Sequence, residues 1–190
     1  VRIGLPLLLI SSLGAPPTTF AQVQPWPAEP AAQATVLTHL DPGFRNNLSG
    51  AHWNSVTRTL WVVCNGPERF WAIVEDGAGG WKVADKGGQR AEYDASGDTE
   101  GITQADQSED VVYLIAESDD EILAYDVSTG GAPVLLNRWG IKWNLPLFSG
   151  GGPEGIAFVP DSWLQRRGFV DSSGSPRTSR HGMGGLMFVG

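Results

Sequence analysis

Three copies of one segment pattern constrain the fold of this chain more than any other feature of its sequence. The first copy begins near Leu48 and contains the runs LSGAHW, TLWVVCN and RFWAIVED. The second begins near Thr99 with TEGITQ, VVYLIAE and EILAYDV. The third begins near Pro153 with PEGIAFVPD and resumes as LMFVG after an insertion over 162–185. Each copy predicts short antiparallel strands joined by turns, repeated at the spacing of about 40 to 50 residues typical of a propeller blade.

The copies share a glycine in their first predicted strand, at Gly50, Gly101 and Gly155. One blade cannot bury both of its faces, and closed propellers typically contain four to eight blades. We therefore predict an all-β fold in which residues 44–190 form part of a β-propeller, with about three blades of a complete set of six. Because three incomplete copies are too few to close a ring, we expect the sequence to be part of a longer protein.

The composition agrees with this fold class and excludes some kinds of binding partner. The chain has 8 Trp, 25 Gly and 13 Pro among short apolar runs, which favours strands and tight turns over long helices. Its net charge of -8 disfavours nucleic acid and anionic lipid as partners. Cys64 is the only cysteine, so no internal disulfide can form, and its apolar run predicts a buried residue.

The N-terminus has the pattern of an export signal. Arg2 is followed by an apolar stretch over 3–13 and by Ala21, which predicts a signal peptide over 1–21 that is cleaved before Gln22. A secreted or periplasmic location follows, with no integral membrane segment after cleavage. Residues 22–43, rich in Pro and Ala, are expected to form a flexible lead-in.

Carboxylates gather at one predicted end of the second copy. Asp98 and Glu100 flank the start of one strand, and Glu117 follows the strand that pairs with it. Neighbouring antiparallel positions are about 5 Å apart, so such carboxylates repel each other unless a cation or a proton lies between them. Calcium prefers oxygen ligands of this kind, so the three residues form a candidate Ca²⁺ site. The alternative is that these side chains cap turns and accept backbone hydrogen bonds.

The second copy also resembles a known family. The segment DTEGI at 98–102, with VVYLIAE and ILAY, is similar to the SdiA-regulated and phytase-like propellers. LSGAHW with TLWVVCN resembles the SdiA-regulated group in particular. GGPEGIAFVPD resembles proteins described as having esterase-like activity of phytase, and the similarity covers residues 44–161. The resemblance implies catalytic calcium bound through the glutamate of an E-G motif and a second glutamate after the next strand, which match Glu100 and Glu117.

The resemblance implies a metal-dependent phosphoester hydrolase, in which calcium lowers the pKa of an attacking water. Such an enzyme needs groups that hold the substrate, and the candidates are Arg90, His52 and Glu154. Arg90 precedes Glu100 by ten residues, Glu154 repeats the E-G glutamate in the third copy, and His52 lies on a predicted inner strand. The alternative is that His52 is a structural residue whose imidazole is hydrogen-bonded within the fold. Arginines in the 162–185 insertion fit either a phosphate clamp or a solvated loop.

Two further functions stay open from the sequence. One is a non-catalytic extracellular module whose rim recognises a carbohydrate, a peptide or an envelope component. The other is a lactonase-like metal propeller, which shares the E-G glutamate.

Overall fold

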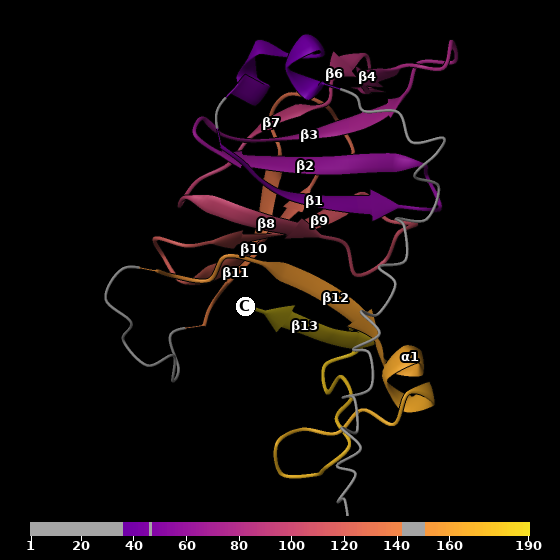
Figure 1. Ribbon diagram of the computed structural model, residues 1–190, viewed down its shortest axis with the longest axis vertical. Coiled ribbons are helices and arrows are strands. Elements are labelled where there is room, and N and C mark those ends of the chain that lie inside the picture. Colours follow the sequence, from indigo (N-terminus) through magenta and orange to yellow (C-terminus); the bar gives the residue numbers. More distant parts are fainter. Residues whose placement is uncertain (1–35, 46, 142–150) are drawn as a thin grey trace, which may run out of the picture. The chain divides into compact units, whose positions relative to one another are not determined.

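The structure, a computed structural model, describes residues 36–45, 47–141 and 151–190, which belong to one compact unit, Val36–Gly190. These residues form antiparallel β-sheets with a single short α-helix among them (Figure 1). The predicted all-β class is confirmed. The expected signal peptide and the lead-in up to residue 35 lie outside the described residues. No helix in the described part of the chain is long and apolar enough to cross a membrane.

The first copy forms a five-stranded sheet, called here the first sheet. Its strands are β1 (Leu48–Asn54), β2 (Thr59–Asn65), β3 (Glu68–Glu75), β4 (Trp81–Val83) and β7 (Glu92–Asp94). They run in the order β1-β2-β3-β4, and β7 also pairs with β3. A separate two-stranded hairpin, β5 (Asp85–Lys86) and β6 (Gln89–Arg90), leads from β4 to β7.

The second copy forms a four-stranded meander, called here the second sheet. Its strands are β8 (Thr99–Thr103), β9 (Val111–Ala116), β10 (Glu121–Asp126) and β11 (Val134–Gly140). The third copy supplies β12 (Ile156–Pro160) and β13 (Gly185–Val189), which pair with each other. The insertion between these two strands opens with the helix α1 (Asp161–Arg166).

The shared glycine explains how neighbouring copies pack. A Cβ atom added to Gly50 would lie 2.8 Å from the carbonyl oxygen of Glu100 and 2.9 Å from the Cα of Gly101. A Cβ added to Gly101 would lie 2.8 Å from the backbone nitrogen of Ile156. The first strands of successive copies, β1, β8 and β12, therefore lie side by side at a distance that excludes a side chain at Gly50 and Gly101.

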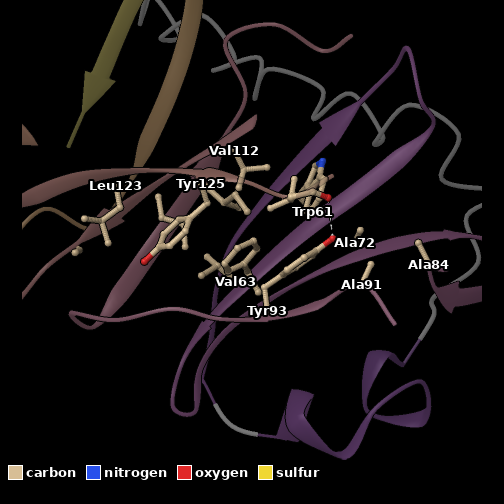
Figure 2. Close-up of a cluster of buried hydrophobic side chains, with 14 residues drawn as sticks. Trp61, Val63, Ala72, Ala84, Ala91, Tyr93, Val112, Leu123 and Tyr125 are labelled. Atoms are coloured by element: carbon tan, nitrogen blue, oxygen red, sulfur yellow. Dashed lines mark hydrogen bonds between the residues drawn. The ribbon is translucent and has the colours of Figure 1, made fainter. Parts of the chain in front are cut away.

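A core between the first and second sheets holds them together. Phe70 of β3 stacks on Tyr93 of β7 at 4.9 Å and meets Tyr125 of β10 at 5.7 Å between ring centroids. The Tyr93 hydroxyl donates a hydrogen bond of 3.1 Å to the carbonyl oxygen of Val127. Figure 2 shows members of this cluster, which come from both sheets. Each large apolar side chain buried there stabilises the fold by about 1.5–3 kcal/mol.

The opposite face of the first sheet packs on the residues before β1. Phe44 meets Trp71 edge-on at 4.6 Å between ring centroids, and Leu37 and Leu40 pack against the same cluster. Two 3-10 turns, η2 (Leu37–His39) and η3 (Pro42–Arg45), present these side chains. The end of the segment expected as a flexible lead-in is therefore structured. Cys64 is buried in this second cluster, as expected.

The described strands form separate sheets and not a closed ring. The sequence therefore predicts the class and the repeated antiparallel unit, while closure into a propeller is not seen among these residues.

Candidate metal centre

Asp98, Glu100 and Glu117, called here the acidic cluster, meet at one end of the second sheet. One carboxylate oxygen from each residue lies within 4.8 Å of the others. Glu100 is buried, with 8% of its surface exposed, and the other two are half-buried. The three residues that the sequence predicts as metal ligands are thus brought together.

Local backbone geometry positions the cluster. Thr99 pairs with Ala116 and Gly101 pairs with Ile115, so Glu100 is the extra residue of a β-bulge, a feature that re-aims a side chain. Asp98 has φ of 57°, a left-handed conformation that Asp and Asn adopt more readily than most residues. The Glu117 backbone N–H donates a 2.8 Å hydrogen bond to the Asp98 carbonyl oxygen, which ties the two ends of the cluster together.

Neighbouring elements contact two of the carboxylates. The Asn65 side-chain amide of the first sheet donates a 2.5 Å hydrogen bond to Glu100 Oε1. Asn47 Nδ2 in turn donates to Asn65 Oδ1. The backbone N–H of Gly152 donates a 2.8 Å hydrogen bond to Glu117 Oε1, and a Cβ at Gly152 would lie 2.4 Å from Glu117 Cγ. The first two copies and the segment before β12 thus contribute to the surroundings of the cluster.

Negative charge in the cluster is poorly compensated. Partial burial, followed by the charges of Glu100, Glu117 and Glu68, raises the pKa of the Asp98 carboxyl above its ordinary value. Within the described ranges, no Lys, Arg or His lies within ion-pair distance of the three cluster carboxylates. A site with three carboxylates and no cationic partner among the described residues can bind a metal ion or retain a proton.

The first copy repeats the backbone of this site without its charge. Asn47 stands 51 positions before Asp98 and has φ of 55°, and Ser49 is the extra residue of an equivalent bulge. The Asn65 backbone N–H donates to the Asn47 carbonyl oxygen at 3.3 Å, as Glu117 does to Asp98. Sequence analysis missed Asn47, although its position one repeat before Asp98 could have identified it.

Arg90 and Glu154 take other partners. The Arg90 guanidinium of β6 pairs with Asp41 and, at 3.1 Å, with Glu92. Glu154 is exposed, and its backbone N–H donates a 2.7 Å hydrogen bond to the Gly190 carbonyl oxygen. Within the described part of the protein, neither side chain forms a hydrogen bond or ion pair with the acidic cluster.

His52 faces the second sheet. Gly50 and Asn54, two positions before and after it, lie on the same face of β1. Gly50 approaches Gly101, and Asn54 Nδ2 donates a 2.7 Å hydrogen bond to Gln104 Oε1. His52 Nε2 is buried with no hydrogen-bond partner among the described residues, and burial lowers the pKa of the imidazole. His52 is therefore positioned for packing between the sheets.

Arginines of the insertion contact other residues of the insertion. Arg177 Nε donates a 2.6 Å hydrogen bond to Asp171 Oδ2. The pKa of Asp171 is lowered chiefly by the hydrogen bond from the Ser173 hydroxyl, and then by those from Arg177 and the Ser175 backbone. The Arg167 guanidinium lies 5.5 Å from the centroid of the Trp163 ring. These contacts organise the insertion itself.

No protein-family model matches this chain, and no curated protein is significantly similar to it in sequence.

Proposed function

We propose that this chain is an exported calcium-binding protein of the phytase-like β-propeller type, and that the acidic cluster holds the ion. The observation that carries the proposal is the approach of three carboxylate oxygens to within 4.8 Å of one another. Side-by-side sheets with equivalent bulges at Ser49 and Glu100 support the blade interpretation.

Calcium suits the donor set better than a transition metal does. The cluster contains only carboxylate ligands, which are hard oxygen donors, and Ca²⁺ takes 6–8 oxygens at about 2.3–2.6 Å with tolerant geometry. Mg²⁺ demands a near-ideal octahedron, and zinc sites are usually built with His or Cys. Burial and, after it, repulsion from neighbouring carboxylates raise the pKa of Asp98, and a bound Ca²⁺ would offset that repulsion.

Recognition is the activity that the site supports best. A Ca²⁺ ion held by three residues keeps open coordination positions, which would bind an anionic group such as a phosphate ester or an acidic sugar. Catalysis of phosphoryl transfer additionally needs cationic side chains around the transferred group. Arg90 and Arg177, two of the candidates for that role, are engaged with other carboxylates. We therefore propose an extracellular binding module first.

Phosphoester hydrolysis is the second candidate. The observation that favours it is the placement of Glu100 and Glu117 together, because these residues match the calcium ligands that the resemblance to phytase-like propellers implies. In such an enzyme, the ion would lower the pKa of a bound water for attack on phosphorus.

Calorimetric titration with CaCl₂, followed by inositol hexakisphosphate, tests both candidates. We expect one strong Ca²⁺ site, lost in Glu100→Gln with Glu117→Gln and kept in Glu109→Gln, which removes an exposed carboxylate between β8 and β9. Calcium-dependent ligand binding without phosphate release supports the recognition module. Phosphate release that chelation abolishes supports the hydrolase. Unchanged calcium affinity in the double variant contradicts the site.

A further inference from the structure

The second sheet has two apolar faces, and one of them is only partly covered. Leu114 and Leu123 belong to the core that packs against the first sheet. Their strand neighbours Tyr113 and Ile122 lie on the opposite face, because side chains alternate along a strand. Trp139 of β11 pairs with Ile122 and stacks on Tyr113 at 6.3 Å between ring centroids, so it belongs to this opposite face. Trp139 is 40% exposed, which leaves a large apolar side chain open to a ligand.

A groove of about 570 Å³ lies along this face of the second sheet. Tyr113, Ile122 and Trp139 line it, and so do Leu186 and Met187 of β13. Its volume falls within the range of about 300–1,000 Å³ that small-molecule sites occupy. Methionine is unbranched and adapts to ligands of irregular shape. The groove therefore suits the apolar part of one small molecule.

The insertion supplies the polar part of the groove. Ser179, Arg180 and His181, from the loop before β13, also line it. This loop is closed at its base, since the Ser179 N–H donates a 2.9 Å hydrogen bond to Asp161 Oδ1 and the Gly184 N–H donates to Ser179 Oγ at 3.2 Å. A hydroxyl, a guanidinium and an imidazole can each donate a hydrogen bond, so this part of the groove favours a ligand that accepts them.

The polar part of the groove carries positive charge. Among the described residues, Arg180 has no carboxylate oxygen within ion-pair distance. Glu121, at the start of β10, is already paired with Arg138 at 3.3 Å. Asp161, at the base of the loop, accepts a backbone N–H. A guanidinium offers two parallel N–H groups that match a carboxylate, so Arg180 favours a ligand with that group.

We propose that this groove binds an amphipathic carboxylate, a small molecule with an apolar chain and one terminal carboxylate. The chain lies against Ile122, Trp139 and Met187, and the carboxylate accepts hydrogen bonds from Ser179 and Arg180. A neutral sugar fits less well, because most of the lining side chains are aliphatic, thioether or aromatic groups. The groove shares no residue with the acidic cluster, so the inference is independent of calcium binding.

Octanoate is the probe, and octanamide is its neutral counterpart of the same length and shape. Added to the full 190-residue chain in a chelating buffer, octanoate should bind with a Kd of about 1 mM or lower, and octanamide should bind about fivefold more weakly. In NMR spectra, octanoate should shift the indole N–H signal of Trp139 and the amide signal of Met187. The indole signal of Trp53, which is 42% exposed on the first sheet, should not move.

Three chain variants separate the charge from the apolar wall. Arg180→Gln should weaken octanoate binding by about fivefold and leave octanamide binding unchanged, because it removes the cation alone. Arg166→Gln is the matched control, since Arg166 is exposed on α1 and does not line the groove, and it should keep the preference for octanoate. Trp139→Ala should weaken the binding of both probes by about tenfold, because it removes part of the apolar wall.

Four results would overturn the proposal. Octanoate does not bind the parent, or octanoate and octanamide bind it equally. The preference for octanoate survives in Arg180→Gln, or is lost in Arg166→Gln. A Trp139 signal that moves with protein concentration alone also contradicts it, because a second copy of the chain would then occupy the groove. If circular dichroism shows that Trp139→Ala is unfolded, the comparison of Arg180→Gln with Arg166→Gln decides.

Discussion

At the residue scale, the environment of His52 has a measurable consequence. Its Nε2 is buried without a partner and its pKa is lowered by burial, so the folded chain holds the imidazole neutral. In the unfolded chain, His52 takes up a proton near its ordinary pKa of 6.5. The folded state therefore loses stability as the pH falls through that value and on toward the lower pKa of the folded protein.

The first prediction compares His52→Leu with the parent by urea unfolding at pH 7.5 and pH 5.5. The parent should lose more unfolding free energy on acidification than the variant does, because leucine has no proton to gain. His39→Leu, at an exposed position, is the control and should follow the parent. Equal pH dependence in the parent and His52→Leu would contradict the assignment.

The second prediction concerns repulsion within the acidic cluster. Without calcium, Glu100→Gln with Glu117→Gln should raise the unfolding free energy by about 1 kcal/mol or more, since the like charges lie within 4.8 Å of one another and are partly shielded from solvent. Differential scanning calorimetry in a chelating buffer measures this. A lower melting temperature in the double variant would show that the carboxylates stabilise the metal-free fold.

Much of the acidic cluster could be predicted from sequence because antiparallel pairing brings the residues before one strand next to those after its partner. Asp98 and Glu117 follow from this rule alone. The Asn65 donor and the Gly152 amide could not be predicted, because their contacts depend on how separate copies pack. Strand periodicity likewise gave no means of telling which neighbour His52 faces.

At the element scale, the bulge and the glycine after it form one structural feature that recurs in two copies. In both β1 and β8 the bulge residue precedes a glycine that lies against the next copy. Runs of apolar residues predicted the strands β2, β3, β9 and β10. The bulges could not be predicted, because the alternation of apolar and polar residues along a strand does not show where one extra residue is inserted.

The third prediction tests the close approach of β8 and β12. In Gly101→Ala, the new Cβ would meet the Ile156 nitrogen at 2.8 Å and the Gly155 Cα at 3.2 Å, and neither backbone atom can move aside cheaply. Unfolding by denaturant should show a loss of about 1–3 kcal/mol. Gly155→Ala is the matched control, because nothing lies within 4 Å of its added Cβ. A loss in Gly101→Ala no greater than that in the control would refute the packing.

At the scale of the whole described unit, the packing of the copies determines where the acidic cluster lies. The chain has a net charge of -8, and its acidic cluster lies where the first two copies and the segment before β12 come together. The repeat pattern predicted the sheets and their order, because each copy forms a local meander. It could not predict the two 3-10 turns before β1, because their positions depend on the face of the first sheet that Phe44 covers.

The central claim is that Asp98, Glu100 and Glu117 share one calcium ion, and thermal unfolding with and without calcium tests it most directly. A ligand that binds only the folded state at a hundred times its Kd stabilises that state by about 2.7 kcal/mol, so the parent's Tm should rise by several degrees in CaCl₂ relative to chelator. Glu100→Gln with Glu117→Gln should abolish the rise, and Glu109→Gln should retain it. An unchanged Tm in the parent, or an equal rise in the double variant, would contradict the account.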